Sequence, residues 1–344
     1  MIREILREGF VLKEKGYYKR AIESFYKALE LDSSSVELLL EIAECYYFLD
    51  DEERALSYIE QTLDRCPTHI DSLKLLKRIF MRKSAFSEAE QTAKNIYCIS
   101  QKDEDLAEIF NLLNRQCRYA EIFTYGQEVS SSAILYEKSY AKFRLNEYEE
   151  ALNFINQALE IDADNKKWLL KGEILYAMNR RDECSELLAQ ISLDDNADSR
   201  VLNFAGLVKQ HECDFDSALE YFLRAIQKDS ANDELYYNCA STYFKIGDSQ
   251  NAKKYYNLAI SLAPENRNYH FALANLYYSE KHYKRAMEEL DYDFFEANLL
   301  KSIILYDSGY LALAKKELDK LAQEQPENDL IIDYQKKIDE ELKI

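Results

Sequence analysis

Alanine recurs along this chain at a nearly fixed spacing, and this regularity limits the folds that the sequence can adopt. The successive steps are 34, 34, 62, 33, 34, 34, 34 and 28 residues, and Ala120 lies near the middle of the long step. Such a period indicates a repeat architecture, in which one supersecondary unit stacks on the next. The column contains Ala21, Ala55, Ala89, Ala151, Ala218, Ala252, Ala286 and Ala314, with Cys184 in one gap.

Other small or scarce residues fall into columns of the same period. With the alanine counted as position 20, position 8 is small in eight of nine repeats, and Lys77 is the exception. Position 15 holds Gly16, Gly247 and Gly309, and position 32 holds all three prolines. Small residues at 8 and 20 let two helices approach closely, glycine at 15 ends the first helix, and proline at 32 stops the second.

The period and its columns resemble the tetratricopeptide repeat family over essentially the whole chain. This resemblance implies an all-α fold, a right-handed α-solenoid of about ten helix–turn–helix repeats over residues 1–328. We expect degenerate short repeats at 104–131 and 267–294. Residues 329–344 are expected to form a C-terminal capping helix, because solenoid ends need a polar outer face. Its predicted apolar face is Leu330, Tyr334, Ile338 and Leu342.

Two further structural predictions concern local features of this array. The repeat at 104–131 is short and lacks its small residues, so we expect it to divide the array into an N-terminal and a C-terminal segment. Repeat 165–198 is expected to be regular. Capping boxes are expected to begin several first helices, at Ser34, Thr68, Ser100 and Ser230.

Charge and composition exclude several classes of function. The chain has 44 Lys and Arg against 63 Asp and Glu, which gives a formal net charge of −19. Such a surface repels phosphate backbones and anionic lipids, so we expect neither nucleic-acid binding nor membrane insertion. The charged start lacks the apolar core of a signal peptide. The seven cysteines form no CxxC pair, and we expect reduced thiols in a cytoplasmic protein.

The sequence contains no recognisable catalytic motif. GxGxxG, GxxxxGK[ST], GxSxG and HExxH are all absent, and the four histidines have no metal-ligand spacing with cysteine. Paired carboxylates are common in a chain with 63 of them, and most are explained as solvated helix ends. We therefore predict no enzymatic activity, no cofactor and no metal. His270 is expected to be a packed core residue.

The resemblance also predicts a binding surface. In this family, positions 2, 5, 9 and 12 of the first helices line the concave face, and here many of them are aromatic. Exposed rings suit the binding of an extended or helical peptide. The alternative is that the rings only pack between neighbouring first helices. The predicted peptide-binding residues are Tyr136, Tyr140, Phe143, Tyr176, Tyr237, Phe244, Phe271, Tyr278 and Tyr306.

A basic stripe lies on the first helix of the third repeat, in a chain that is otherwise acidic. Two of its members, Lys74 and Arg78, hold groove positions 5 and 9 and are added to the predicted peptide-binding residues. The stripe either docks an acidic segment of a partner or only pairs with Glu37 and Glu44 of the preceding repeat. It consists of Lys74, Lys77, Arg78, Arg82 and Lys83.

These observations favour a non-enzymatic scaffold or adaptor that binds a protein or peptide partner in an aromatic-lined groove. The alternative is a peptide-sensing regulatory protein whose superhelical pitch changes on binding. An enzyme is the least favoured class, because no nucleophile, base and orienting group are grouped in the sequence. The sequence identifies neither the partner nor the oligomeric state.

Overall fold

The computed structural model describes residues 2–125, 131–194 and 197–342. These residues form twenty α-helices and one 3₁₀ helix, and no strand occurs among them. The predicted all-α fold is therefore confirmed. None of the helices in these ranges is both long and apolar enough to cross a membrane.

First and second helices of the predicted repeats alternate along the chain. The first helices are α1 (Ile2–Glu14), α3 (Val36–Phe48), α5 (Ile70–Arg82), α7 (Asp103–Arg115), α8 (Ser132–Arg144), α10 (Asn165–Ala177), α12 (Ser199–His211), α14 (Asp233–Ile246), α16 (Arg267–Ser279) and α18 (Phe295–Asp307). The second helices are α2 (Tyr18–Leu31), α4 (Glu52–Arg65), α6 (Phe86–Ser100), η1 (Tyr119–Thr124), α9 (Tyr148–Ile161), α11 (Arg181–Leu188), α13 (Phe215–Lys228), α15 (Ser249–Leu262), α17 (Tyr283–Glu289) and α19 (Leu311–Glu324). The last helix is α20 (Asp329–Leu342).

One residue with a positive φ angle lies between each first helix and the second helix that follows. Left-handed backbone at this point ends the first helix and turns the chain back. Glycine at position 15 has the predicted role, and seven other residues adopt the same conformation without being glycine. The ten turn residues are Gly16, Asp50, Ser84, Cys117, Asn146, Asn179, Cys213, Gly247, Lys281 and Gly309.

The columns of small residues lie where two helices meet. Ala21 and Ala252 are fully buried, as are the other alanines of the column. A Cβ atom added to Gly206 of α12 would lie 2.5 Å from the ring of Phe222 in α13. Only a residue without a side chain leaves room for that ring, so the small columns set the distance between helices.

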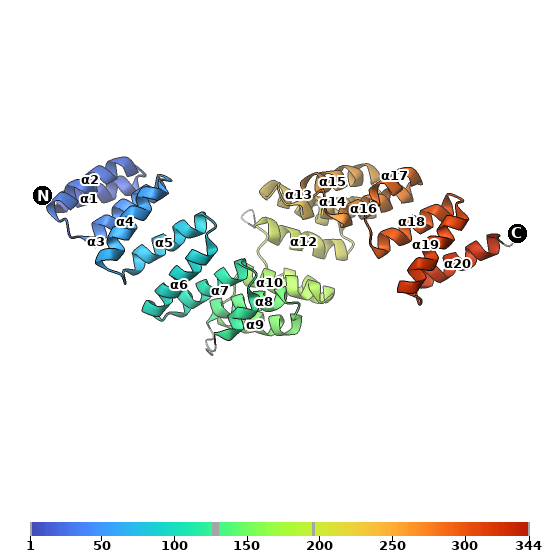
Figure 1. Cartoon of the computed structure of the whole chain (residues 1–344), viewed down its shortest axis with the longest axis horizontal. Helices are drawn as coiled ribbons and strands as arrows, with labels where there is room; N and C mark the ends of the chain where they lie inside the picture. Colours follow the sequence, from blue (N-terminus) through green and yellow to red (C-terminus); the bar gives the residue numbers. More distant parts are fainter. Residues whose placement is uncertain (1, 126–130, 195–196, 343–344) are drawn as a thin grey trace. The chain divides into compact units, whose positions relative to one another are not determined.

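The chain forms two compact units, unit 1 over residues 1–178 and unit 2 over residues 179–344. Within each unit, successive helices pack against one another (Figure 1). The predicted division at repeat 104–131 is wrong, because η1 joins that repeat to its neighbours. The Arg118 guanidinium, just before η1, bonds to Glu90 of the preceding repeat at 2.5 Å, and the Phe123 ring of η1 lies 6.3 Å from that of Phe154 in α9 of the next repeat.

Several second helices are short. The one in repeat 104–131 is η1, with six residues, and α17 in repeat 267–294 has seven. The sequence did not predict that α11, in repeat 165–198, has only eight residues. The boundary between the two units falls in the same repeat, just before α11.

Some helix ends differ from the prediction. The observed N-caps are Ser35, His69 and Asn232, each one or two residues after the predicted capping box. The fourth box is also wrong, because the Ser100 hydroxyl donates to the Asp105 carboxylate instead. These shifts leave the helices in place but change which side chain caps them.

Helix α20 packs on α19 through a face that matches the predicted one only in part, at Tyr334 and Ile338. Ile331 and Ile338 are buried, and the Tyr334 ring lies 5.3 Å from that of Tyr306. Leu330 and Leu342 are about half exposed, at 53% and 51%, so they do not belong to the buried face. The error arises because the buried residues follow a spacing of three and four rather than four throughout.

Candidate functional site

In unit 2, the first predicted groove residue is held in an aromatic stack. The Tyr237 ring on α14 lies 5.0 Å from that of Tyr269 on α16, with the planes 26° apart. It also lies 5.8 Å from the ring of Tyr256 on α15. Tyr237 therefore packs between successive helices, as the alternative interpretation proposed, and only part of its surface faces solvent.

Two further groove tyrosines form hydrogen bonds to the helix after next, α18 for Tyr278 and α20 for Tyr306. The Tyr278 hydroxyl on α16 donates to Asp307 at 2.7 Å, and the Tyr306 hydroxyl on α18 donates to Glu341 at 2.5 Å. The bond to Glu341 raises the pKa of Tyr306 to about 12. Burial and the bond to Asp307 likewise raise the pKa of Tyr278. Both rings are therefore fixed in orientation.

The remaining two groove residues of unit 2 differ in their surroundings. Phe271 on α16 makes an edge contact with Phe294, with the ring centroids 5.6 Å apart. Phe244 on α14 is 37% exposed. Of the five predicted groove residues in unit 2, Phe244 offers the most ring surface to a partner.

Polar side chains that the sequence analysis did not single out lie on the same first helices. The Asn238 amide donates to the Asn203 amide oxygen at 2.9 Å, and Gln210 donates to the Thr242 hydroxyl at 2.7 Å. Lys245, the neighbour of Phe244, donates to Gln210 at 3.0 Å. These contacts join α12 to α14. The sequence could have predicted part of this polar group, because Gln210 occupies a groove position of its repeat.

In unit 1, the predicted groove residues lie on α8 and α10. Tyr136 is buried, and the Lys166 ammonium lies 4.0 Å from its ring centroid. Tyr140 and Phe143 are half-buried against the core of α8 and α9, and Tyr176 is also half-buried. The Tyr136 side chain is thus largely inaccessible to a partner, whereas Tyr140, Phe143 and Tyr176 are partly accessible.

Three cations of the basic stripe form ion pairs, but not with the predicted carboxylates. Lys77 bonds to Glu108 at 3.0 Å, Arg82 bonds to Asp50 at 2.6 Å, and Lys83 lies 3.5 Å from Glu52. Glu44 instead forms an ion pair with Lys13, and Glu37 accepts a hydrogen bond from Ser35. The predicted pairing with Glu37 and Glu44 is wrong, because the stripe is closer to the turn after α3 and to α7.

The two groove cations of the stripe, Lys74 and Arg78, are exposed. Neither has a carboxylate within 4.0 Å among the residues that the structure describes. The guanidinium groups of Arg78 and Arg82 lie 4.7 and 3.7 Å from the ring centroid of Tyr47. Its contact with Arg82 lowers the pKa of Tyr47. Lys74 also borders a hollow of about 520 Å³ that reaches Lys102.

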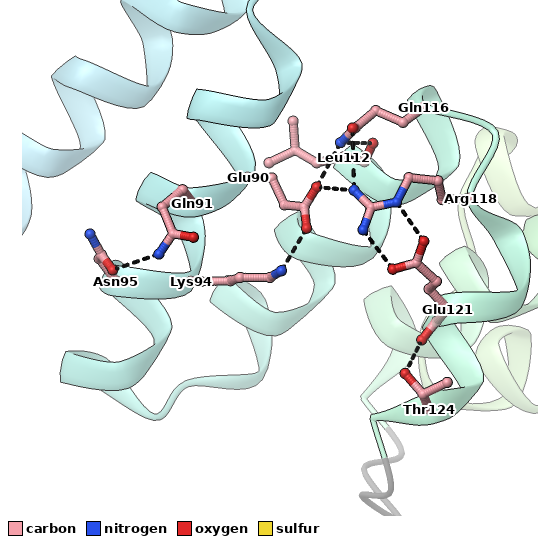
Figure 2. Close-up of polar contacts among 9 residues, drawn as sticks. All are labelled: Glu90, Gln91, Lys94, Asn95, Leu112, Gln116, Arg118, Glu121 and Thr124. Carbon is pink, nitrogen blue, oxygen red and sulfur yellow. Dashed lines mark hydrogen bonds and ion pairs between the residues drawn. The ribbon is translucent and has the colours of Figure 1, made fainter.

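A buried carboxylate, Glu90, joins the short repeat 104–131 to the preceding repeat, which carries the basic stripe. The sequence analysis missed this residue. Figure 2 shows Glu90 of α6 accepting bonds from Lys94 at 2.6 Å, Gln116 at 2.9 Å and Arg118 at 2.5 Å. Arg118 also makes two bonds of 2.5 Å to Glu121 of η1. Burial alone would raise the pKa of Glu90, but the bonds from Lys94 and Gln116 outweigh it and lower the pKa.

The prediction for His270 is wrong. Its ring is only half-buried and bonds to Glu289 at 2.8 Å and to the Pro264 carbonyl oxygen at 3.0 Å. It therefore joins α16 to α17 and to the preceding turn. Within the described ranges, no three His, Cys, Asp or Glu side chains are grouped to hold a metal ion.

Comparison with known proteins finds matching repeat models and curated relatives. Models described as tetratricopeptide repeat match residues 6–35, 142–207 and 233–266. A BBSome complex member, the BBS4 homolog of Drosophila melanogaster, is 20% identical over 285 residues, which cover 82% of this chain and 55% of the relative. The TPR repeat-containing protein MJ1428 of Methanocaldococcus jannaschii is 23% identical over 309 residues, with 81% and 53% covered. The chain thus spans about half the length of these curated relatives.

A solved structure has a similar fold. A chain in the crystal structure of the APC/C hetero-tetramer Cut9–Hcn1 superposes with a TM-score of 0.61 at 12% identity. The superposition covers 97% of this chain and 75% of that one, and at this identity it shows the fold alone. The matched repeat models, the repeated left-handed turns and the buried small columns together show that this chain is built of tetratricopeptide repeats.

Proposed function

We propose that this protein is a non-enzymatic scaffold or adaptor that binds segments of partner proteins on its first helices. The observation that carries the proposal is Phe244, an exposed ring in a row of rings that are otherwise fixed by their neighbours. Tyr237, Tyr278 and Tyr306 are each held by a stack or a hydrogen bond. A surface that is ordered before binding loses little entropy when a partner docks.

The chemistry of this surface suits a peptide segment. The partly exposed rings can pack on apolar side chains, and the amide groups of Asn203 and Gln210 can bond to a peptide backbone. In unit 1, Lys74 and Arg78 add positive charge that suits acidic side chains. The proposed partner segment in unit 2 is therefore apolar, and the one in unit 1 is acidic.

The relatives support a role in assembly. One of them is named as a member of the BBSome complex, and it is similar to this chain over most of the chain's length. We extend to this protein only the general property that such a repeat array joins other proteins. Its own partners, its location in the cytoplasm and the absence of nucleic-acid binding stay predictions.

A pair of matched variants tests the proposal. Phe244 on a first helix and Leu258 on a second helix are almost equally exposed, at 37% and 38%. We expect Phe244→Ser to weaken capture of the native partner at least about fivefold, as for a contact in the centre of an interface. We expect Leu258→Ser to leave capture unchanged. Equal capture by both variants, with both folded, would refute the groove as the binding site.

The alternative of a peptide-sensing regulator makes a different prediction. A sensor changes conformation when its ligand binds, whereas a scaffold binds through a surface that is already ordered. Spin labels on α3 and α18 would measure this directly. A distance distribution that shifts on addition of the captured partner favours the sensor, and an unchanged distribution favours the scaffold.

A further inference from the structure

A second basic surface lies in unit 2, where α15, α16 and α17 meet. It comprises Lys253 of α15, Lys281 in the turn before α17, and Lys284 and Arg285 in the first turn of α17. None of these belongs to the groove residues. Residues 245–285 contain seven Lys or Arg against three Asp or Glu, in a chain whose net charge is −19. Positive charge thus exceeds negative charge in this segment, as it does in the basic stripe of unit 1.

The contacts of the structure show that these cations share one surface. The Lys253 ammonium bonds to Glu280 at the end of α16, at 2.6 Å. The Lys253 ammonium and the Arg285 guanidinium lie 5.5 and 5.8 Å from the ring centroid of Tyr277. Arg285 also lines a hollow of about 520 Å³, together with Lys281, His282, Tyr283 and Lys284.

Most of this positive charge is not neutralised within the fold. Lys281, Lys284 and Arg285 are exposed, and in the described part of the chain no carboxylate lies within 4.0 Å of their charged groups. Of the nearby carboxylates, Glu280 bonds to Lys253 and Glu289 to His270, while the exposed Glu288 of the same helix lies more than 4.0 Å from these charged groups. An anion from outside the chain can therefore reach these cations.

We propose that this α15–α17 basic surface docks an acidic segment of a partner protein. A short acidic peptide can place several carboxylates over the hollow, with Tyr277 and Tyr283 offering ring surface for its apolar atoms. A long polyanion such as RNA, or a membrane, would extend over the surrounding acidic surface and be repelled. The proposal goes beyond the groove function and uses none of its residues.

Fluorescence anisotropy with a fluorescein-labelled oligoglutamate peptide tests the proposal on the full chain. We expect the peptide to bind, and its affinity to fall as sodium chloride is raised. The triple variant Lys281→Glu, Lys284→Glu and Arg285→Glu should weaken binding at least about tenfold. The control is Lys316→Glu, Lys320→Glu and Lys336→Glu, which changes the net charge equally at exposed sites of α19 and α20. It should bind like the wild type.

Three results would overturn the proposal. The first is no binding of the peptide at low salt. The second is an equal loss in the control, which would mean that net charge alone is responsible. The third is tighter binding of single-stranded RNA or of phosphatidylserine vesicles, lost in the same triple variant, which would assign the surface to another class of partner. A failure of the Phe244 experiment leaves this surface unaffected, because the two sets of residues differ.

Discussion

At the scale of single residues, each helix pair depends on one left-handed turn residue. For residues other than glycine this conformation costs about 1–2 kcal/mol, although Asn and Asp tolerate it better. The glycines at this position were predictable from the sequence, but Cys213 and Lys281 have the same conformation and gave no signal. They adopt it because the helices on both sides fix the turn, which is a property of packing and not of the residue.

Substituting two glycines of unit 2 measures two free-energy costs separately, one from packing and one from backbone conformation. Gly206→Ala should lower the free energy of unfolding by about 1–3 kcal/mol, because the new methyl group meets the Phe222 ring. Gly247→Ala should cost about 1 kcal/mol from its positive φ alone, since a Cβ atom there meets nothing within 4 Å. Urea denaturation followed by circular dichroism measures both. A Gly206→Ala protein as stable as the wild type would contradict the role of the small column.

At the scale of helices, the sequence predicted the first helices and the short repeats at 104–131 and 267–294, but not the short α11. Fixed columns identify a helix pair because small residues must lie where two helices meet, and the buried Ala252 confirms this. The length of α11 and the 3₁₀ form of η1 depend on contacts that have no column. The candidate site was likewise predictable only in part. Its ring positions were predictable, whereas Glu90 and its partners join residues about 26 apart without a repeated spacing.

The buried Glu90 network gives a prediction for stability and pH. Glu90→Gln should lower the free energy of unfolding by about 1–3 kcal/mol, since charge-assisted bonds to Lys94 and Arg118 are lost. Because folding lowers the pKa of Glu90, its stabilisation is complete above the pH at which an ordinary glutamate ionises. It is lost as acid brings the pH down through the lowered pKa. The difference between variant and wild type should therefore shrink on acidification.

The measurement is thermal unfolding at a series of pH values, with Glu121→Gln as the control. Glu121 is exposed and contacts the same Arg118, so its loss should have a much smaller effect. An equal loss of stability in the two variants would show that burial of Glu90 is not what matters. A difference that grows at low pH would contradict the sign of the pKa shift.

The basic stripe on α5 gives a prediction for binding kinetics. Reversing Lys74 and Arg78 to Glu should slow association with an acidic partner segment, and the effect should shrink as ionic strength rises. The matched control reverses Lys19 and Lys27, two exposed residues of α2, for the same change in net charge. Surface plasmon resonance with the captured partner measures both rates. Association that is indifferent to salt and to Lys74 and Arg78 would leave these cations without a role in binding.

At the scale of the whole molecule, the chain consists of two compact units, and each should respond to its own variants. Trp168, the only tryptophan, lies on α10 of unit 1 and reports its unfolding by fluorescence. Glu90→Gln should lower the midpoint of this fluorescence transition. Gly206→Ala should lower the circular-dichroism midpoint and leave the fluorescence midpoint unchanged. If both variants move both transitions equally, the chain unfolds as one cooperative unit.

The central claim is that partner segments bind on the first helices, at Phe244. A photo-crosslinking residue such as p-benzoylphenylalanine, placed at position 244 or at position 258 of the full chain, tests this directly. Both positions are similarly exposed, but only Phe244 lies on a first helix. We predict that light links the partner to position 244 and not to 258. Crosslinking at 258 with none at 244, in proteins that both fold and bind, would contradict the account.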